Sequence, residues 1–354
     1  MKYIPGLNGL RAVAAIMVVI YHWTQPFVEK NPNFKYFILN GNFGVNIFFV
    51  LSGFLITTIL LNEKNKHLSE VGNKKKIIFN FYARRFLRIF PIYYLTISLV
   101  YFIKLPGFSE NLLFYVSYTE NFNIFLNSSW DSFSHTWSLA VEEQFYLIWP
   151  FVILFTTKDK LLPVLITFIL IGPIFSIFQT YIIKNTLNAF ILTPSCFDAF
   201  GLGALLAYFY INNSLEILKK NVKIALPISI LLFIYWQMAP TGGHFQYIKR
   251  INESIIACGL ILFCLSKNYV RIRDRILENK VMYYLGLVSY GIYLFHYSIP
   301  YLYSILNTNY WGVIQPISIF IHYLIMFLIL VAMSFLSYYI IEKPILKFKN
   351  KFDY

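Results

Sequence analysis

Residues 83–94 read Ala83-Arg84-Arg85-Phe86-Leu87-Arg88-Ile89-Phe90-Pro91-Ile92-Tyr93-Tyr94. Three arginines thus stand at the start of a long apolar run, a position that usually marks the cytoplasmic end of a transmembrane helix. The guanidinium group also presents a rigid fork of donors that matches phosphate oxygens. The stretch therefore predicts a membrane span. It leaves open whether Arg84, Arg85 and Arg88 set the topology or bind a phosphorylated ligand that enters from the aqueous side.

The composition extends this prediction to the whole chain of 354 residues. Hydrophobic residues make up 58% and charged residues 13%, with a mean hydropathy of +0.59, whereas soluble domains carry about 25% charged residues. Apolar runs long enough to cross about 30 Å of hydrocarbon recur along the sequence. We therefore expect an all-α integral membrane protein with about ten transmembrane helices. They lie near 9–28, 43–61, 83–104, 143–156, 161–183, 192–211, 222–239, 254–267, 281–305 and 315–341.

Basic residues are distributed unevenly between the two sides of these spans. Placing the N-terminus inside leaves six of the 30 Lys and Arg outside, at Lys30, Lys35, Lys104, Lys184, Lys249 and Arg250. Because basic residues favour the cytoplasmic side, both termini are expected to be cytoplasmic, in a multi-pass protein of the inner (plasma) membrane. The net charge of +14 then faces anionic lipid headgroups. We expect membrane lipids as partners, and no nucleic acid.

The chain is expected to form one membrane domain, 1–345, followed by a cytoplasmic basic tail, 346–354. The segment 111–126 is apolar but contains Glu120, Asn121 and Asn123, which favours a re-entrant or interfacial helix over a span. The three cysteines and six histidines show no metal-ligand spacing, so no metal site is predicted. The sequence gives no indication of the oligomeric state.

Arg11 and His22 share one face of the first expected helix. Eleven residues separate them, which corresponds to an offset of about 20° and a rise of about 16 Å. His22 would then lie beyond mid-membrane on the same stripe as Arg11. A buried ionisable residue in a membrane span is a functional hypothesis by default. The alternative is a structural histidine that is hydrogen-bonded to a neighbouring helix.

The segment 135–150 carries a polar face into the next expected span. Helical spacing places Ser138, Glu142, Tyr146 and Trp149 on one side. Adjacent Glu142 and Glu143 point about 100° apart, so only one of them is expected to face a cavity. That carboxylate could orient a histidine or bind a substrate hydroxyl, and the alternative is a solvated helix terminus.

Two further spans contain polar residues. Ser289, Tyr293 and His296 fall on one face of the ninth, where they either line the same cavity or only join helices through hydrogen bonds. Asp198 is a charge within the sixth span and therefore requires a partner.

Together these motifs resemble the acyltransferase-3 family of integral membrane O-acyltransferases, from about residue 3 to 345. The resemblance rests on the order and spacing of six motifs. They are Gly9-Leu10-Arg11 with His22, residues 44–55 (GVNIFFVLSGFL), Arg85-Phe86-Leu87-Arg88, residues 135–146 (HTWSLAVEEQFY), residues 289–296 (SYGIYLFH) and Ile341-Glu342-Lys343-Pro344.

The resemblance implies transfer of an acyl group, most often acetyl, from cytoplasmic acyl-CoA to a hydroxyl of a cell-surface or lipid-linked carbohydrate. Carried over to this sequence, the resemblance implies that Arg85 and Arg88 bind the CoA phosphates and that His22 acts with Arg11 in catalysis. From their positions we also expect Arg84 to bind the donor and Glu142 to take part in catalysis. His22 could act as general base or as transient acyl carrier, since imidazole titrates near pH 6.5. The expected acceptor-side residues are His135, Trp137, Ser138, Glu143, Tyr293 and His296.

Two features differ from the family pattern. Many relatives carry Asp where this chain has Asn46, and some continue into a soluble esterase-like domain, whereas this sequence ends at Tyr354. We therefore expect a stand-alone member that transfers directly to a glycan hydroxyl, because a further transfer step by such a domain would require a separate protein. The alternative function is a permease or flippase that moves a glycan or glycolipid without acyl-transfer chemistry.

Overall fold

The computed structural model describes residues 3–31, 40–66, 73–184, 190–238, 246–306 and 316–352. Within these residues every regular element is a helix, which confirms the all-α membrane class. Six described helices are long and apolar enough to cross a membrane, and a bent pair, 248–265 with 270–276, would make a seventh. The count of ten spans and the side on which the termini lie stay predictions.

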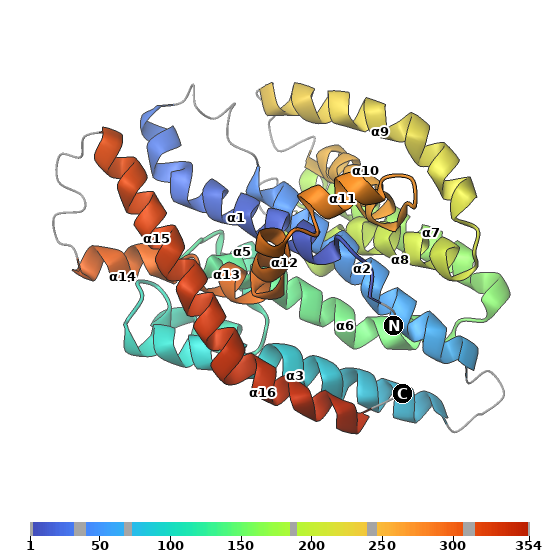
Figure 1. Cartoon of the computed structure of the whole chain (residues 1–354), viewed down its shortest axis with the longest axis horizontal. Coiled ribbons are helices and arrows are strands. Elements are labelled where there is room, and N and C mark those ends of the chain that lie inside the picture. The colour runs from blue at the N-terminus through green and yellow to red at the C-terminus, as the bar shows by residue number, and fades with distance from the viewer. Residues whose placement is uncertain are drawn as a thin grey trace.

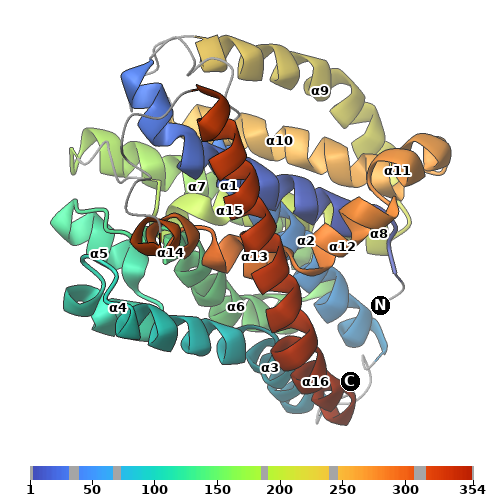
Figure 2. The same ribbon diagram turned by 60° about the vertical axis from the view of Figure 1, so that its left-hand side comes forward.

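The long helices coincide with nine of the ten expected spans. They are α1 (Leu7–Lys30), α2 (Gly41–Lys66), α3 (Asn73–Phe102), α6 (Trp137–Phe155), α7 (Lys158–Tyr181), α8 (Phe197–Ile211), α9 (Leu215–Met238), α10 (Gln246–Leu265) and α15 (Pro316–Ser337). The end of α2, the start of α3 and the short α16 (Lys343–Leu346) lie at one end of the bundle, and α4, α5 and α14 at the other (Figures 1 and 2).

The ninth expected span, 281–305, differs from the prediction because it is divided into three short helices. These are α12 (Lys280–Leu287), α13 (Ser289–Phe295) and α14 (Ser298–Leu306). At the second break the His296 ring bonds to the Tyr293 carbonyl oxygen, and the Trp23 indole donates to the His296 carbonyl oxygen at 2.8 Å. Side chains thus satisfy backbone groups that a continuous helix would pair internally, which makes a break tolerable at membrane depth.

The segment expected to be re-entrant or interfacial forms two helices too short to span. They are α4 (Leu112–Val116) and α5 (Glu120–Asn127). The polar residues that argued against a span are buried, and Asn121 bonds the Gln144 side chain of α6, which itself donates to the Tyr118 carbonyl oxygen at 2.8 Å. This segment therefore packs against the start of α6 and holds that helix end in place.

Glycines set the closest helix contacts at the centre of the bundle. A Cβ placed on Gly53 of α2 would lie 2.1 Å from the Phe200 carbonyl oxygen of α8, and one on Gly203 of α8 would lie 2.1 Å from the Val50 carbonyl oxygen of α2. Such distances are impossible for any other residue, so the two backbones touch directly. Small residues at helix contacts are typical of membrane bundles.

A second glycine contact joins α1 to the segment around α12. A Cβ on Gly9 would lie 2.0 Å from the Leu277 carbonyl oxygen, and one on Gly286 would lie 1.8 Å from the Asn8 carbonyl oxygen. Because α13 follows α12 directly, this contact also holds α1 beside the broken span. It thereby brings the histidines of the two segments together.

The partner that Asp198 requires is Arg250 of α10. Their side chains form an ion pair with Nε and Oδ1 3.2 Å apart, and the carboxylate is fully buried. The same guanidinium donates to the Phe190 carbonyl oxygen at 2.9 Å and to the Ser195 carbonyl oxygen. Arg250, which was counted among the basic residues outside the expected spans, therefore lies within a helix, where Asp198 compensates its charge.

Removing one member of this pair should destabilise the protein strongly. Asp198→Ala leaves the buried Arg250 charge without its carboxylate, for which we expect a loss of about 3–5 kcal/mol in the free energy of unfolding. Asp274→Ala, at an ion pair whose carboxylate is about half exposed, is the control and should cost no more than about 1 kcal/mol. Unfolding in detergent measures both, and equal losses would contradict a structural role for the buried pair.

Candidate active site

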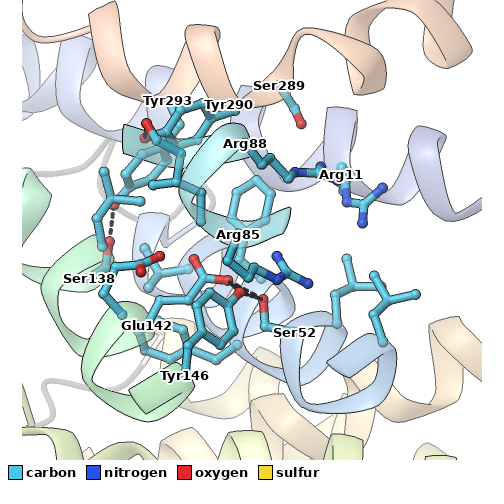
Figure 3. Close-up of a pocket in the computed structure, with 18 residues that line it drawn as sticks. Arg11, Ser52, Arg85, Arg88, Ser138, Glu142, Tyr146, Ser289, Tyr290 and Tyr293 are labelled. Carbon is cyan, nitrogen blue, oxygen red and sulfur yellow. Dashed lines mark hydrogen bonds between the residues drawn. The ribbon is translucent and has the colours of Figure 1, made fainter. Parts of the chain in front are cut away.

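A cavity of about 90 Å³, here called the inner pocket, lies among α1, α2, α3, α6 and the α12–α13 segment (Figure 3). It combines charged and apolar side chains. Its polar lining consists of Arg11, Ser52, Arg85, Arg88, Ser138, Glu142, Glu143, Tyr146, Ser289, Tyr290 and Tyr293. Seven of the twelve residues assigned to the site from the sequence therefore line one cavity.

Three arginines line the inner pocket, and in the described part of the chain none of them is paired with an acid, although Glu142 and Glu143 line the same cavity. Within the described residues, none of Arg11, Arg85 and Arg88 forms an ion pair. The Arg85 guanidinium lies 4.7 Å from the centre of the Tyr146 ring, and Arg11 donates to the Asn8 side chain at 3.1 Å. Like charges that line one cavity repel one another, so unpaired arginines here favour binding of an anionic ligand.

The two glutamates of α6 both line the inner pocket, so the expectation that only one would face a cavity is wrong. The Ser52 hydroxyl and the Tyr146 hydroxyl both donate to the Glu142 carboxylate (Figure 3). Although neighbours on a helix diverge by about 100°, this cavity extends around α6 from α2 to α3. Glu142 is thus fixed by hydrogen bonds on the α2 side.

A second, larger cavity of about 940 Å³, here called the basic pocket, adjoins the inner pocket at Arg85 and Arg88. It lies at the end of the bundle where α2 ends and α3 begins. Its charged lining comprises five basic residues and one acid: Lys66, Arg84, Arg85, Arg88, Lys349 and Glu63. Since Lys66 pairs with Glu63 at 2.7 Å, the remaining cations leave a strongly positive cavity.

The C-terminal segment forms part of the basic pocket. The Arg84 guanidinium donates to the Phe352 carbonyl oxygen at 3.3 Å and holds this segment against α3. Lys349 thereby joins the pocket lining. Residues 346–354 were expected to be only a basic tail, and Lys349 was not among the predicted site residues. Its sequence signal was the run of lysines at 343, 347, 349 and 351.

Three histidines from distant parts of the sequence meet behind the inner pocket. His22 Nδ1 lies 2.9 Å from His296 Nε2, and the ring centres of His135 and His296 are 4.7 Å apart. We call these three residues the histidine cluster. His135 also stacks on Tyr297 at 5.0 Å with nearly parallel planes. None of the three lines either cavity described above.

Tyr293 separates the inner pocket from the histidine cluster. Its hydroxyl bonds the Ser138 hydroxyl (Figure 3). The same hydroxyl donates to the His135 carbonyl oxygen at 3.0 Å. Its own carbonyl oxygen accepts a hydrogen bond from His296 Nδ1 at 2.6 Å. One residue thus contacts both the cavity that the arginines line and the histidines beyond it.

The remaining predicted site residues are divided between these places. Arg11 and His22, expected to act as a pair, are separated: Arg11 joins Arg85 and Arg88, and His22 joins the histidine cluster. Trp137 is buried against the Phe49 and Phe190 rings and does not line the inner pocket. The roles proposed for all of these residues stay predictions.

The chain is similar to known proteins over nearly its whole length. A family model described as an acyltransferase domain matches residues 4–341. The peptidoglycan O-acetyltransferase OatA of Listeria monocytogenes is 33% identical, covering 98% of this chain and 56% of its own length. The O-acetyltransferase OatA of Staphylococcus aureus is 28% identical, over 98% of this chain and 58% of its own.

The putative peptidoglycan O-acetyltransferase YrhL of Bacillus subtilis is 30% identical, over 97% of this chain and 55% of its own length. The chain therefore spans little more than half of the length of these relatives. No solved structure matches it. Because the family model covers nearly all of the sequence, this chain belongs to the acyltransferase-3 family, as its motifs predicted.

Proposed function

We propose that this protein is a membrane O-acyltransferase that moves an acyl group from acyl-CoA to a hydroxyl of a carbohydrate. The acyl group that we propose is acetyl. The observation that carries the proposal is the group of three arginines without acidic partners, two of which join the inner pocket to the basic pocket. Relatives named as peptidoglycan O-acetyltransferases favour peptidoglycan as the acceptor.

The basic pocket suits the phosphorylated part of CoA. Five basic side chains against one acid favour a polyanion, and arginine binds phosphate through paired, charge-assisted hydrogen bonds. We propose that this pocket opens to the cytoplasm, where acyl-CoA is available. Both termini would then be cytoplasmic, as the distribution of basic residues predicts.

The inner pocket suits the thin pantetheine arm and its acyl end. Its volume of about 90 Å³ is well below the range of about 300–1,000 Å³ for pockets that enclose drug-sized ligands. An extended arm can pass Arg85 and Arg88 and bring the thioester towards Ser138 and Tyr293. A permease or flippase would need room for a sugar along this path, so the size of the pocket favours acyl transfer over transport.

Chemistry would take place where the thioester reaches the histidine cluster beyond Tyr293. The acceptor hydroxyl oxygen bonds the acyl carbon, the carbon–sulfur bond breaks, and the hydroxyl proton passes through His22 to the departing thiolate. His22 suits this role because it is half-buried, whereas His135 and His296 are 3% and 0% exposed. Glycan would then approach from the side of the bundle opposite the basic pocket.

Donor binding should depend on the two arginines that both pockets share. Arg85→Ala and Arg88→Ala each remove charge-assisted bonds worth about 1.5–3 kcal/mol, so the affinity for CoA should fall about tenfold or more. Lys75→Ala, an exposed position on the same helix, is the matched control and should bind normally. Calorimetric titration with CoA checks this. Unchanged CoA affinity in both arginine variants would contradict donor binding by these residues and would leave them only a role in setting the membrane topology.

Acyl transfer should require His22. Purified protein in lipid nanodiscs should release free CoA from acetyl-CoA only when a glycan acceptor is added, and His22→Ala should lower this rate by about 10²–10⁴ through loss of the base. CoA affinity should persist in this variant. His322→Ala, outside the histidine cluster, should remain active. Full activity of His22→Ala would make the residue incidental, and an inactive wild-type protein would favour the permease.

Labelling of single cysteines should reveal the orientation of the bundle. Lys66→Cys at the basic pocket should react with a membrane-impermeant maleimide only after cells are permeabilised, whereas the exposed Glu110→Cys should react in intact cells. The three native cysteines are buried and should give little background. Reaction of both positions in intact cells would contradict a cytoplasmic basic pocket.

A further inference from the structure

A chain of two hydrogen bonds runs from the Tyr293 carbonyl oxygen through His296 to His22. We propose that His296 is a positioning residue that holds the proton of His22 on Nδ1 and leaves the lone pair on Nε2. Nε2 of His22 is then the atom that acts on the substrate. This inference rests on the proposed acyltransferase function, and it assigns His296 a role other than the substrate contact expected from the sequence.

The first hydrogen bond fixes the proton of His296. Its Nδ1 lies 2.6 Å from the Tyr293 carbonyl oxygen, and a carbonyl oxygen has no proton to donate. Nδ1 of His296 must therefore carry the hydrogen. A neutral imidazole has one N–H group, so Nε2 of His296 is left as an acceptor.

The second hydrogen bond then fixes the proton of His22. Nδ1 of His22 lies 2.9 Å from Nε2 of His296. Because that Nε2 can only accept, Nδ1 of His22 must donate. The single proton of neutral His22 is thus on Nδ1, and its Nε2 carries the lone pair. The planes of the two imidazole rings are nearly parallel, with an angle of 23° between them.

The surroundings favour neutral histidines. The groups that face His296 are Trp23, His22, His135, Tyr293 and Tyr297, and none of them is acidic. Within the described part of the chain, no carboxylate forms an ion pair with a member of the histidine cluster. A buried imidazolium here would be an uncompensated charge, which is strongly unfavourable in a membrane interior.

Accessibility decides which histidine can meet the substrate. His296 is 0% exposed and its backbone is held by the Trp23 indole, so its ring has no free edge. His22 alone of the cluster is half-buried rather than buried. The remaining nitrogen of His22, Nε2, is therefore available for reaction. The arrangement follows the general logic in which a base is oriented, and its tautomer set, by a neighbouring group.

Both roles left open for His22 need this tautomer. As general base, Nε2 takes the hydroxyl proton while the hydroxyl oxygen bonds the acyl carbon, and it then returns the proton to the departing thiolate. As acyl carrier, Nε2 bonds the acyl carbon while the carbon–sulfur bond breaks and the thiolate leaves. The hydroxyl oxygen then bonds the acyl carbon, the carbon–nitrogen bond breaks, and the hydroxyl proton passes through the freed Nε2 to the thiolate. In both cases the positive charge on His22 is stabilised through its Nδ1–H group, which donates to His296.

Three substitutions of His296 separate positioning from packing. In His296→Gln the amide oxygen reaches the place of Nε2 and can still accept from His22, whereas Asn reaches only the place of Nδ1 and Ala neither. We expect His296→Gln to keep kcat within about tenfold, the size of one hydrogen bond. His296→Asn and His296→Ala should lose about 10²-fold, the lower end of general-base effects, with an unchanged KM for acetyl-CoA.

A measurement without turnover tests the tautomer directly. Nitrogen-15 NMR of histidine-labelled protein in nanodiscs should show His22, assigned by loss of its signal in His22→Gln, with a protonated Nδ1 and an unprotonated Nε2. His296→Ala should lose this preference, whereas His322→Ala should keep it. A proton on Nε2 of His22 in the wild type, or equal kcat for the Gln, Asn and Ala variants, would overturn the inference. Absence of acyl transfer by a wild-type protein with the expected spectrum would instead overturn the proposed function.

Discussion

A guanidinium group inside a membrane protein must find its hydrogen-bond acceptors in the protein or in a ligand, because hydrocarbon offers none. Arg250 meets this requirement completely, with the Asp198 carboxylate and two backbone carbonyl oxygens around it. Arg11, Arg85 and Arg88 do not, since none of them forms an ion pair in the described residues and all three line one cavity. The same side chain is thus structural in one place and available to an anionic ligand in another.

Helix contacts at glycines hold together the elements that carry the unpaired arginines and the histidine cluster. Gly9 and Gly286 let α1 touch the α12 segment, and α1 contacts α13 as well. Arg11 is near the start of α1 and reaches the inner pocket, whereas His22, about three turns later, reaches His296. The end of α13 before His296 is also required, because it leaves the Tyr293 carbonyl oxygen available to the His296 side chain. A continuous helix would not present that acceptor to an imidazole in the same way.

Sequence periodicity predicted the helices well, because a run of apolar residues of membrane length has few alternatives. It also predicted that Asp198 would be paired and that Ser138, Glu142 and Tyr146 would share a face. It could not predict which helices are neighbours, so Arg250 as the partner, Lys349 in the basic pocket and the separation of Arg11 from His22 were all missed. Ser52 lay within a quoted motif, yet only the contact between α2 and α6 shows that it bonds Glu142.

Tyr293 gives this arrangement a functional logic, since its two polar groups serve the two halves of the site. Its hydroxyl closes the inner pocket by bonding Ser138, while its carbonyl oxygen sets the proton of His296 and, through it, that of His22. A thioester that displaces the Tyr293 hydroxyl from Ser138 need not disturb the carbonyl bond, because the hydroxyl is on the side chain and the carbonyl is part of the helix backbone. Under the proposed reaction, the donor can therefore be admitted while His22 keeps the tautomer that transfer needs.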